Sequence, residues 1–114
     1  MPPTDVVRVQ HVLDAARQAT GLAEGRSRAD LDTDVMLNLS LVRLLEIIGE
    51  AARGLTAAFR EAHPDVPWRK MAGMRDRLVH GYFDVNLDVV WQTVTRDLPP
   101  LIAGIEEIVR EADR

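Results

Sequence analysis

The sequence predicts an all-α fold, an antiparallel bundle of four to five helices. Long stretches carry apolar residues at steps of three and four, which is the pattern of a helix with one buried face. No stretch of useful length alternates between apolar and polar residues, as a half-buried strand would. The chain of 114 residues has the length of one domain, so we expect residues 1–114 to form a single helical domain.

The composition excludes several kinds of protein. There is no cysteine, which excludes disulfides and thiolate metal sites and suits a reducing compartment. No long run of uncharged apolar residues is present, so we expect a cytoplasmic protein without a membrane-spanning helix. The formal net charge of −4 argues against a general nucleic-acid coat protein, but it allows an enzyme with one basic cleft.

The first helix is expected to begin at Thr4, which can cap it, and to end near residue 23. Asp5 would lie in its first turn, where the helix dipole favours a negative charge. Gly21 and Gly25 lie where this helix would fray and stop. A single apolar stripe is formed by Val6, Val9, Leu13, Ala16, Ala19 and Ala23.

The second helix should be the central one. Asp30, Asp32 or Asp34 can cap it, and no proline interrupts the segment from Val35 to about Ala62. Apolar residues on most sides of a helix indicate that it is buried among its neighbours. Here they are Leu37, Leu41, Leu44, Leu45, Ile47, Ile48, Ala51, Ala52 and Leu55.

One charged stripe interrupts the apolar surface of this central helix. Arg43, Glu46, Glu50 and Arg53 fall within an arc of about 80° at 100° per residue. One interpretation is a solvated strip with weak ion pairs. In the other interpretation the charges lie inside a helical assembly, where they orient a site or a partner subunit.

A third helix is expected to begin at Trp68, after Pro64 and Pro67 have ended the central one. Gly73 in its middle costs stability, which suggests that another backbone comes close there. The residues expected to point inward are Trp68, Met71, Met74, Leu78 and Val79.

The last helix is expected from about Leu87 to Ala112. Pro99-Pro100 should kink or split it, because two prolines remove two backbone donors. Its predicted inner face consists of Val90, Trp91, Val94, Leu98, Leu101, Ile102, Ile105 and Val109.

The stretch from Trp68 to Phe83, WRKMAGMRDRLVHGYF, concentrates the polar and reactive side chains. Its four cations against one acid give it a formal charge of +3, in a chain whose net charge is −4. A local positive field of this kind favours phosphate more than net charge does. The cations are Arg69, Lys70, Arg75 and Arg77, and the acid is Asp76.

His80 and Arg75 are the residue types that metal-free cleavage of an RNA phosphodiester needs. Near neutral pH a histidine can take the 2′-hydroxyl proton or donate one to the leaving oxygen. An arginine can neutralise the charge that builds on the phosphate oxygens. Asp76, one turn before His80, can accept a ring N–H and fix the tautomer. Three scattered histidines and no cysteine give no recognisable metal spacing, so we expect no metal and no cofactor.

The spacing of Arg75 and His80 leaves their geometry open. Five residues apart, the two side chains point roughly 140° apart on a straight helix. They can act on one atom if the arginine bends round, if the helix ends near Gly81, or if a second copy of the chain contributes.

Three segments together resemble the HepT-like ribonuclease toxins, small all-α domains of the HEPN superfamily. They are residues 44–55 (LLEIIGEAARGL), residues 63–91 (HPDVPWRKMAGMRDRLVHGYFDVNLDVVW) and the DLPPL that begins at Asp97. The likeness includes an R-x4-H-x-Y signature, formed by Arg75, His80 and Tyr82, and the paired glutamates Glu46 and Glu50.

The resemblance implies a HEPN-like helical bundle that acts as an endoribonuclease toxin. Arg75 and His80 match the catalytic pair, and Asp76 matches the polar position after the arginine, which in the superfamily is often Asn. The paired glutamates Glu46 and Glu50 belong to the resemblance and, with Arg43 of the charged stripe, are expected to be supporting residues. It implies a homodimer whose cleft gathers the motif from each subunit, which would answer the 140° separation.

The resemblance also implies a partner, a minimal nucleotidyltransferase antitoxin that modifies Tyr82 with AMP. An adenylate beside Arg75 would compete with RNA phosphate for that cation. Two alternatives stay open. The protein can be a non-catalytic helical module that binds a nucleotide or a partner, and Tyr82 can be an ordinary core residue.

Overall fold

The computed structural model describes residues 3–78 and 85–113, and this part of the chain is helical without a strand. The elements are α1 (Pro3–Ala23), α2 (Asp30–Thr33), α3 (Val35–Arg53), α4 (Ala57–Ala62), α5 (Trp68–Ala72), α6 (Met74–Leu78), α7 (Leu87–Gln92), the π-helical turn η1 (Thr93–Asp97) and α8 (Leu98–Ala112). The prediction of an all-α bundle is confirmed.

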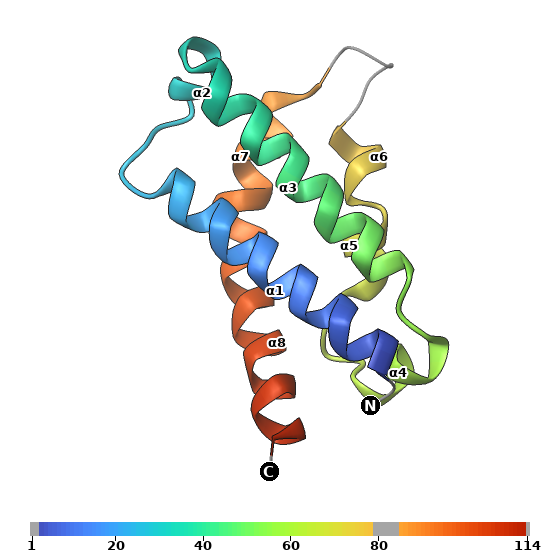
Figure 1. Cartoon of the computed structure of the whole chain (residues 1–114). Helices are drawn as coiled ribbons and strands as arrows, with labels where there is room; N and C mark the ends of the chain where they lie inside the picture. Colours follow the sequence, from blue (N-terminus) through green and yellow to red (C-terminus); the bar gives the residue numbers. More distant parts are fainter. Residues whose placement is uncertain (1–2, 79–84, 114) are drawn as a thin grey trace.

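The central helix α3 organises the bundle. α1 runs antiparallel to it and packs along most of its length (Figure 1). α5 and α6 pack against α3, while α8 lies against α1 (Figure 1). No helix in the described part of the chain is both long enough and apolar enough to cross a membrane.

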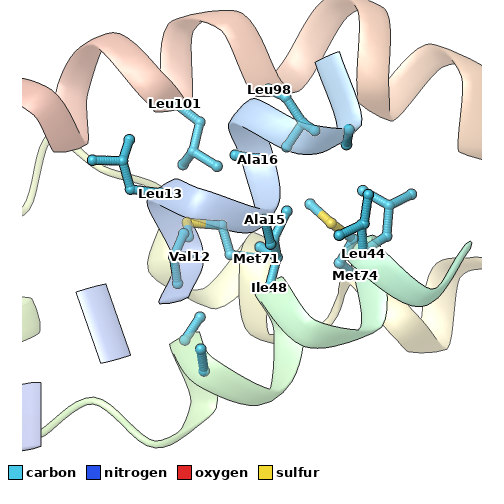
Figure 2. Close-up of a cluster of buried hydrophobic side chains, with 14 of the residues drawn as sticks. Val12, Leu13, Ala15, Ala16, Leu44, Ile48, Met71, Met74, Leu98 and Leu101 are labelled. Carbon is cyan, nitrogen blue, oxygen red and sulfur yellow. The ribbon is translucent and has the colours of Figure 1, made fainter. Parts of the chain in front are cut away.

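The core forms where these helices meet. Figure 2 shows Val12 and Ala15 of α1 on the side of Ile48 of α3 and Met71 of α5, and Ala16 on the side of Leu101 of α8. Each large apolar side chain buried in this way contributes about 1.5–3 kcal/mol relative to an exposed one. The predicted inner faces are largely confirmed, but Val6 is exposed. The side chains of Leu78 and Val79 lie outside the described residues.

A side-chain cap begins the central helix α3. Asp34 accepts a hydrogen bond from the Leu37 N–H at 3.0 Å and caps α3, as one of the three predicted aspartates. Its hydrogen bond from Arg26, at 2.7 Å, lowers the pKa of the Asp34 carboxyl below its ordinary value. Gly25 ends the first helical segment with φ +74°, as expected of a glycine at that position.

The predicted end of the central helix is wrong. The segment from residue 35 to 62 is two helices, because α3 ends at Arg53 and Thr56 caps a separate α4. The buried carboxylate of Asp5 accepts hydrogen bonds from the Thr56 N–H at 3.0 Å and the Thr56 hydroxyl at 2.7 Å. Asp5 thus links the start of α4 to α1.

The predicted start of the first helix is also wrong. Thr4 does not cap α1, which begins at Pro3.

The predicted third helix breaks into α5 and α6 at Gly73. A Cβ added at Gly73 would lie 3.5 Å from the Arg69 carbonyl oxygen, an ordinary contact within the same segment. The close approach of two backbones occurs instead at Gly49 of α3. There a Cβ would lie 3.3 Å from the Met71 carbonyl oxygen and 3.6 Å from that of Ala72. The expectation about Gly73 is therefore wrong.

The last helix is interrupted as predicted, but before the prolines. The break is η1, in which the Leu98 N–H donates to the Thr93 carbonyl, five residues back. Pro99 and Pro100 lie in the first turn of α8, where a missing N–H leaves no hydrogen bond unmade. α8 begins at Leu98, directly after this wider turn.

Candidate active site

The catalytic candidates divide into described and undescribed residues. Arg75 and Asp76 lie on α6, and both side chains are exposed. His80 and Tyr82 fall in residues 79–84, outside the described part of the chain. The convergence of Arg75 with His80 therefore stays a prediction.

α6 is held against α3 by burial on one side and by a close backbone contact on the other. Met71 and Met74 are buried in the core and anchor the α5–α6 segment. At Gly49 an added Cβ would lie 3.8 Å from the Arg75 amide nitrogen. The backbone of Arg75 thus passes close to α3 while its side chain points to solvent.

Arg53, the last residue of α3, is a residue of this region to which the sequence assigned no individual role. Its Nη2 donates a hydrogen bond to the Ala72 carbonyl oxygen at 2.9 Å. The same atom lies 3.9 Å from a carboxylate oxygen of Asp76. The charged stripe of the central helix was the only signal that could have identified it.

The basic side chains of α5 and α6 fall into two groups. Lys70 and Arg77 share Asp97 of η1, with N–O distances of 3.5 and 3.7 Å. Arg77 also donates to the Thr93 hydroxyl at 3.4 Å. Arg69 and Arg75 are exposed, and neither has an ion-pair partner among residues 3–78 and 85–113. Within the described part of the stretch, these are the two cations that no ion pair engages, which favours them as phosphate ligands.

The predicted supporting residues pair with one another. Arg43 lies 3.3 Å from Glu46 and 3.7 Å from Glu50, all along α3. In the described part of the chain no ion pair joins them to Arg75 or Asp76. Their arrangement fits the solvated strip, whereas Arg53 at the end of the stripe reaches the candidate site.

The exposed face of α3 has an apolar end. Three of its first five residues, Val35, Met36 and Leu39, are 66%, 75% and 62% exposed. Arg43 follows one turn after Leu39 on the same face. Exposed apolar side chains grouped on one helix face are typical of surfaces that bind another molecule.

Two further features bear on ligands. An open groove of about 530 Å³ lies between α1 and α3, lined among others by Arg8, His11 and Glu50, and neither Arg75 nor Asp76 lines it. Within the described ranges, no three His, Cys, Asp or Glu side chains lie together as a metal site would require.

Comparison with known proteins identifies relatives along most of the chain. A family model described as "Ribonuclease HepT-like" matches residues 12–108. A "Putative RNase" of Caldanaerobacter subterraneus subsp. tengcongensis is 40% identical over 103 residues, which cover 90% of this chain and 92% of that protein. A "Probable ribonuclease HepT" of Thermococcus cleftensis is 43% identical over 79 residues, covering 69% of this chain and 72% of that protein.

A third relative, a "Putative RNase" of Methanocaldococcus jannaschii, is 33% identical over 95 residues, or 83% of this chain and 87% of that protein. No solved structure matches the chain. The family model spans the central helix, the α5–α6 segment and most of the last helix, and its range in the sequence includes Arg75, His80 and Tyr82. The chain therefore belongs to the HepT-like ribonuclease family, within the HEPN superfamily.

Proposed function

We propose that this protein is an endoribonuclease toxin that cleaves RNA in the cytoplasm without a metal ion. The observation that carries the proposal is the match of the ribonuclease family model to residues 12–108. The exposed Arg75, without an ion-pair partner in the described part of the chain, supports it. A guanidinium that no carboxylate neutralises is free to bind a phosphate.

The proposed reaction is attack of the RNA 2′-oxygen on the adjacent phosphorus. The His80 imidazole takes the 2′-hydroxyl proton as the new O–P bond forms. The bond from phosphorus to the 5′-oxygen breaks, and the leaving oxygen takes up a proton. Arg75 neutralises the negative charge that builds on the phosphate oxygens. Asp76, one turn before His80 in sequence, is proposed to orient the imidazole.

We propose that a second copy of the chain completes the cleft. The face of α3 that carries Val35, Met36 and Leu39 supports this, because it is apolar, exposed and continuous with charges of both signs at Arg43 and Glu50. A face with these properties can meet its own copy across a two-fold axis. α6 contacts the other end of the same helix, at Gly49 and Arg53, so the proposed dimer needs the two α3 helices to pair along their length for both Arg75 segments to lie near one interface.

The partner antitoxin is proposed to be a minimal nucleotidyltransferase that transfers AMP to Tyr82. The tyrosine oxygen attacks the α-phosphorus of ATP, the phenolic proton is lost, and pyrophosphate leaves. The added phosphate brings a negative charge close in sequence to Arg75. Cleavage would stop because the adenylate occupies the cation that RNA needs.

Cleavage of labelled RNA in the presence of EDTA tests the reaction. We expect the wild-type protein to cut, and Arg75→Ala and His80→Ala to lose about 100-fold or more of the rate. Arg110→Ala, on α8, is the control and should cut like the wild type, with circular dichroism verifying equal helicity. Loss of cleavage on chelation, or full activity in both site variants, would contradict the mechanism. Binding of RNA without any product would favour the alternative, a non-catalytic binding module.

Intact-mass analysis tests the modification. After incubation with ATP, magnesium and the nucleotidyltransferase encoded beside it, we expect the wild-type chain to gain the mass of adenylate. Tyr82→Phe should gain nothing, because it lacks the attacking oxygen. A gain in Tyr82→Phe equal to that of the wild type, or none in the wild type, would rule out this switch.

A further inference from the structure

The segment that carries Arg75 does not hold its own shape. α5 and α6 have five residues each, far below the length at which a helix is stable in water by itself. Gly73, between the two helices, has no side chain that could pack against the rest of the molecule. The position of Arg75 therefore depends on what fixes the α5–α6 junction, the residues 72–76, to the rest of the molecule.

Gly49 and Arg53 of α3 both contact this junction. They are four residues apart and therefore lie on one face of α3. Gly49 allows the approach, since an added Cβ would lie 3.3 Å from the Met71 carbonyl oxygen. A glycine hydrogen, however, provides no directional bond. Arg53 provides one, with its Nη2 2.9 Å from the Ala72 carbonyl oxygen.

The carbonyl of Ala72 needs such a donor. Ala72 is the last residue of α5, and the last carbonyls of a helix lack a partner within it. A bond from a charged donor to such an oxygen is stronger than one between neutral groups. Arg53 thus fixes the point at which the chain turns from α5 into α6.

The second contact of Arg53 lies on the other side of the turn. Its Nη2 is 3.9 Å from Asp76, and the two side chains are 59% and 79% exposed. An ion pair so open to water contributes little, so the carbonyl bond is the stronger of the two. Together the two contacts bracket Gly73 and flank Arg75 on both sides in sequence.

We propose that Arg53 is a positioning residue that fixes the α5–α6 junction to α3 and thereby holds Arg75 in place. It acts through the backbone at Ala72 and, more weakly, through Asp76. The first part of the proposal concerns the junction itself. The second, that catalysis depends on it, rests on the proposed function.

Hydrogen exchange of the free protein tests the first part without any RNA. We follow the N–H groups of Gly73 and Arg77, which donate to the Arg69 and Gly73 carbonyls at 3.0 and 3.3 Å. In Arg53→Ala they should exchange about threefold to tenfold faster, as expected when one partly exposed hydrogen bond is lost. Arg53→Lys should recover part of the protection, since it retains one donor. Asp76→Asn should change it less than Arg53→Ala does.

Arg110→Ala is the matched control. Arg110 is also 59% exposed and paired with a glutamate on its own helix, but it lies on α8. It should leave the exchange of Gly73 and Arg77 unchanged. Equal exchange in Arg53→Ala and the wild type would overturn the proposal, whether or not the protein cuts RNA.

Steady-state cleavage tests the second part. We expect Arg53→Ala to lower kcat about tenfold with KM changed less than threefold, because a displaced catalytic group slows the chemical step. Arg53→Lys should restore part of kcat, and melting temperatures should match that of Arg110→Ala. An unchanged kcat in Arg53→Ala would refute the catalytic role. If the wild type cuts no RNA at all, the proposed function fails, and hydrogen exchange still decides whether Arg53 fixes the junction.

Discussion

At the scale of single residues, Gly49 determines how close α5 lies to α3. Its missing side chain leaves room for the carbonyls of Met71 and Ala72, which belong to a segment that begins about twenty residues later. From the sequence we expected a close approach of two backbones at Gly73. Gly49 and Gly73 both lie within predicted helices, so the residue type does not distinguish them. Only the contacts distinguish the two.

Alanine at Gly49 tests this contact. An alanine in a helix is more favourable than a glycine by about 0.5–1 kcal/mol. At Gly21 on α1 nothing lies within 4 Å of the added Cβ, so Gly21→Ala should raise the free energy of unfolding by that amount. Gly49→Ala should be at least about 1 kcal/mol less favourable than Gly21→Ala, because the α5 backbone must move away from the new methyl group. Urea unfolding of both variants measures the difference, and equal stabilisation would show that α5 has room to yield.

Asp5 illustrates another limit of local reasoning. Its place in the first turn of α1 was read correctly from the sequence, as a carboxylate that suits the helix dipole. The sequence did not predict that Asp5 is buried or that it accepts two hydrogen bonds from Thr56, because Thr56 lies 51 residues away. A buried carboxylate with satisfied oxygens holds two helices in register.

At the scale of elements, interruptions were predicted better than their positions. The prolines at 99 and 100 indicated a break in the last helix, and the break is η1, just before them. Threonine hydroxyls contribute to it. Those of Thr93 and Thr95 donate to the carbonyls four residues back, each at 2.7 Å, and such bonds are known to bend helices. The two prolines predicted roughly where the helix is interrupted, but not that the interruption is a π-helical turn.

The position of η1 also determines which basic residues of α5 and α6 have an ion-pair partner. Asp97 at its end forms ion pairs with both Lys70 and Arg77, so two of the four predicted cations share one carboxylate. The formal charge of the stretch can be counted from the sequence, but that count treats its four cations alike. Which of them stay available depends on where the turn places one carboxylate.

At the scale of the whole molecule, the exposed apolar end of α3 is unexplained by a single chain. Val35, Met36 and Leu39 remain open to solvent although α3 is the most central helix. A stable pair of proteins buries about 1,200–2,000 Å² in total, and the solvent-facing side of a nineteen-residue helix is suited to supply the centre of such an interface.

Charges introduced on this face should therefore separate the subunits. We expect the wild type to sediment as a dimer, and Leu39→Glu to sediment as a monomer, because a carboxylate cannot be buried at an apolar interface without a partner. Val6→Glu is the control. Val6 is also exposed, but it lies beside Val109 of α8 rather than on α3. A monomeric wild type, or a dimeric Leu39→Glu, would exclude pairing through this face.

The sequence by itself determined the helical class, most of the buried faces, the locally basic stretch and the family. These follow from apolar periodicity and from residue types at fixed spacing, both of which are written along the chain. The tertiary structure alone decided that Gly49 lies against the α5 backbone, that Asp97 pairs with Lys70 and Arg77, and that Arg53 binds the Ala72 carbonyl. Each of these joins elements distant in the chain, and no local pattern specifies which side chains meet across the space between two helices.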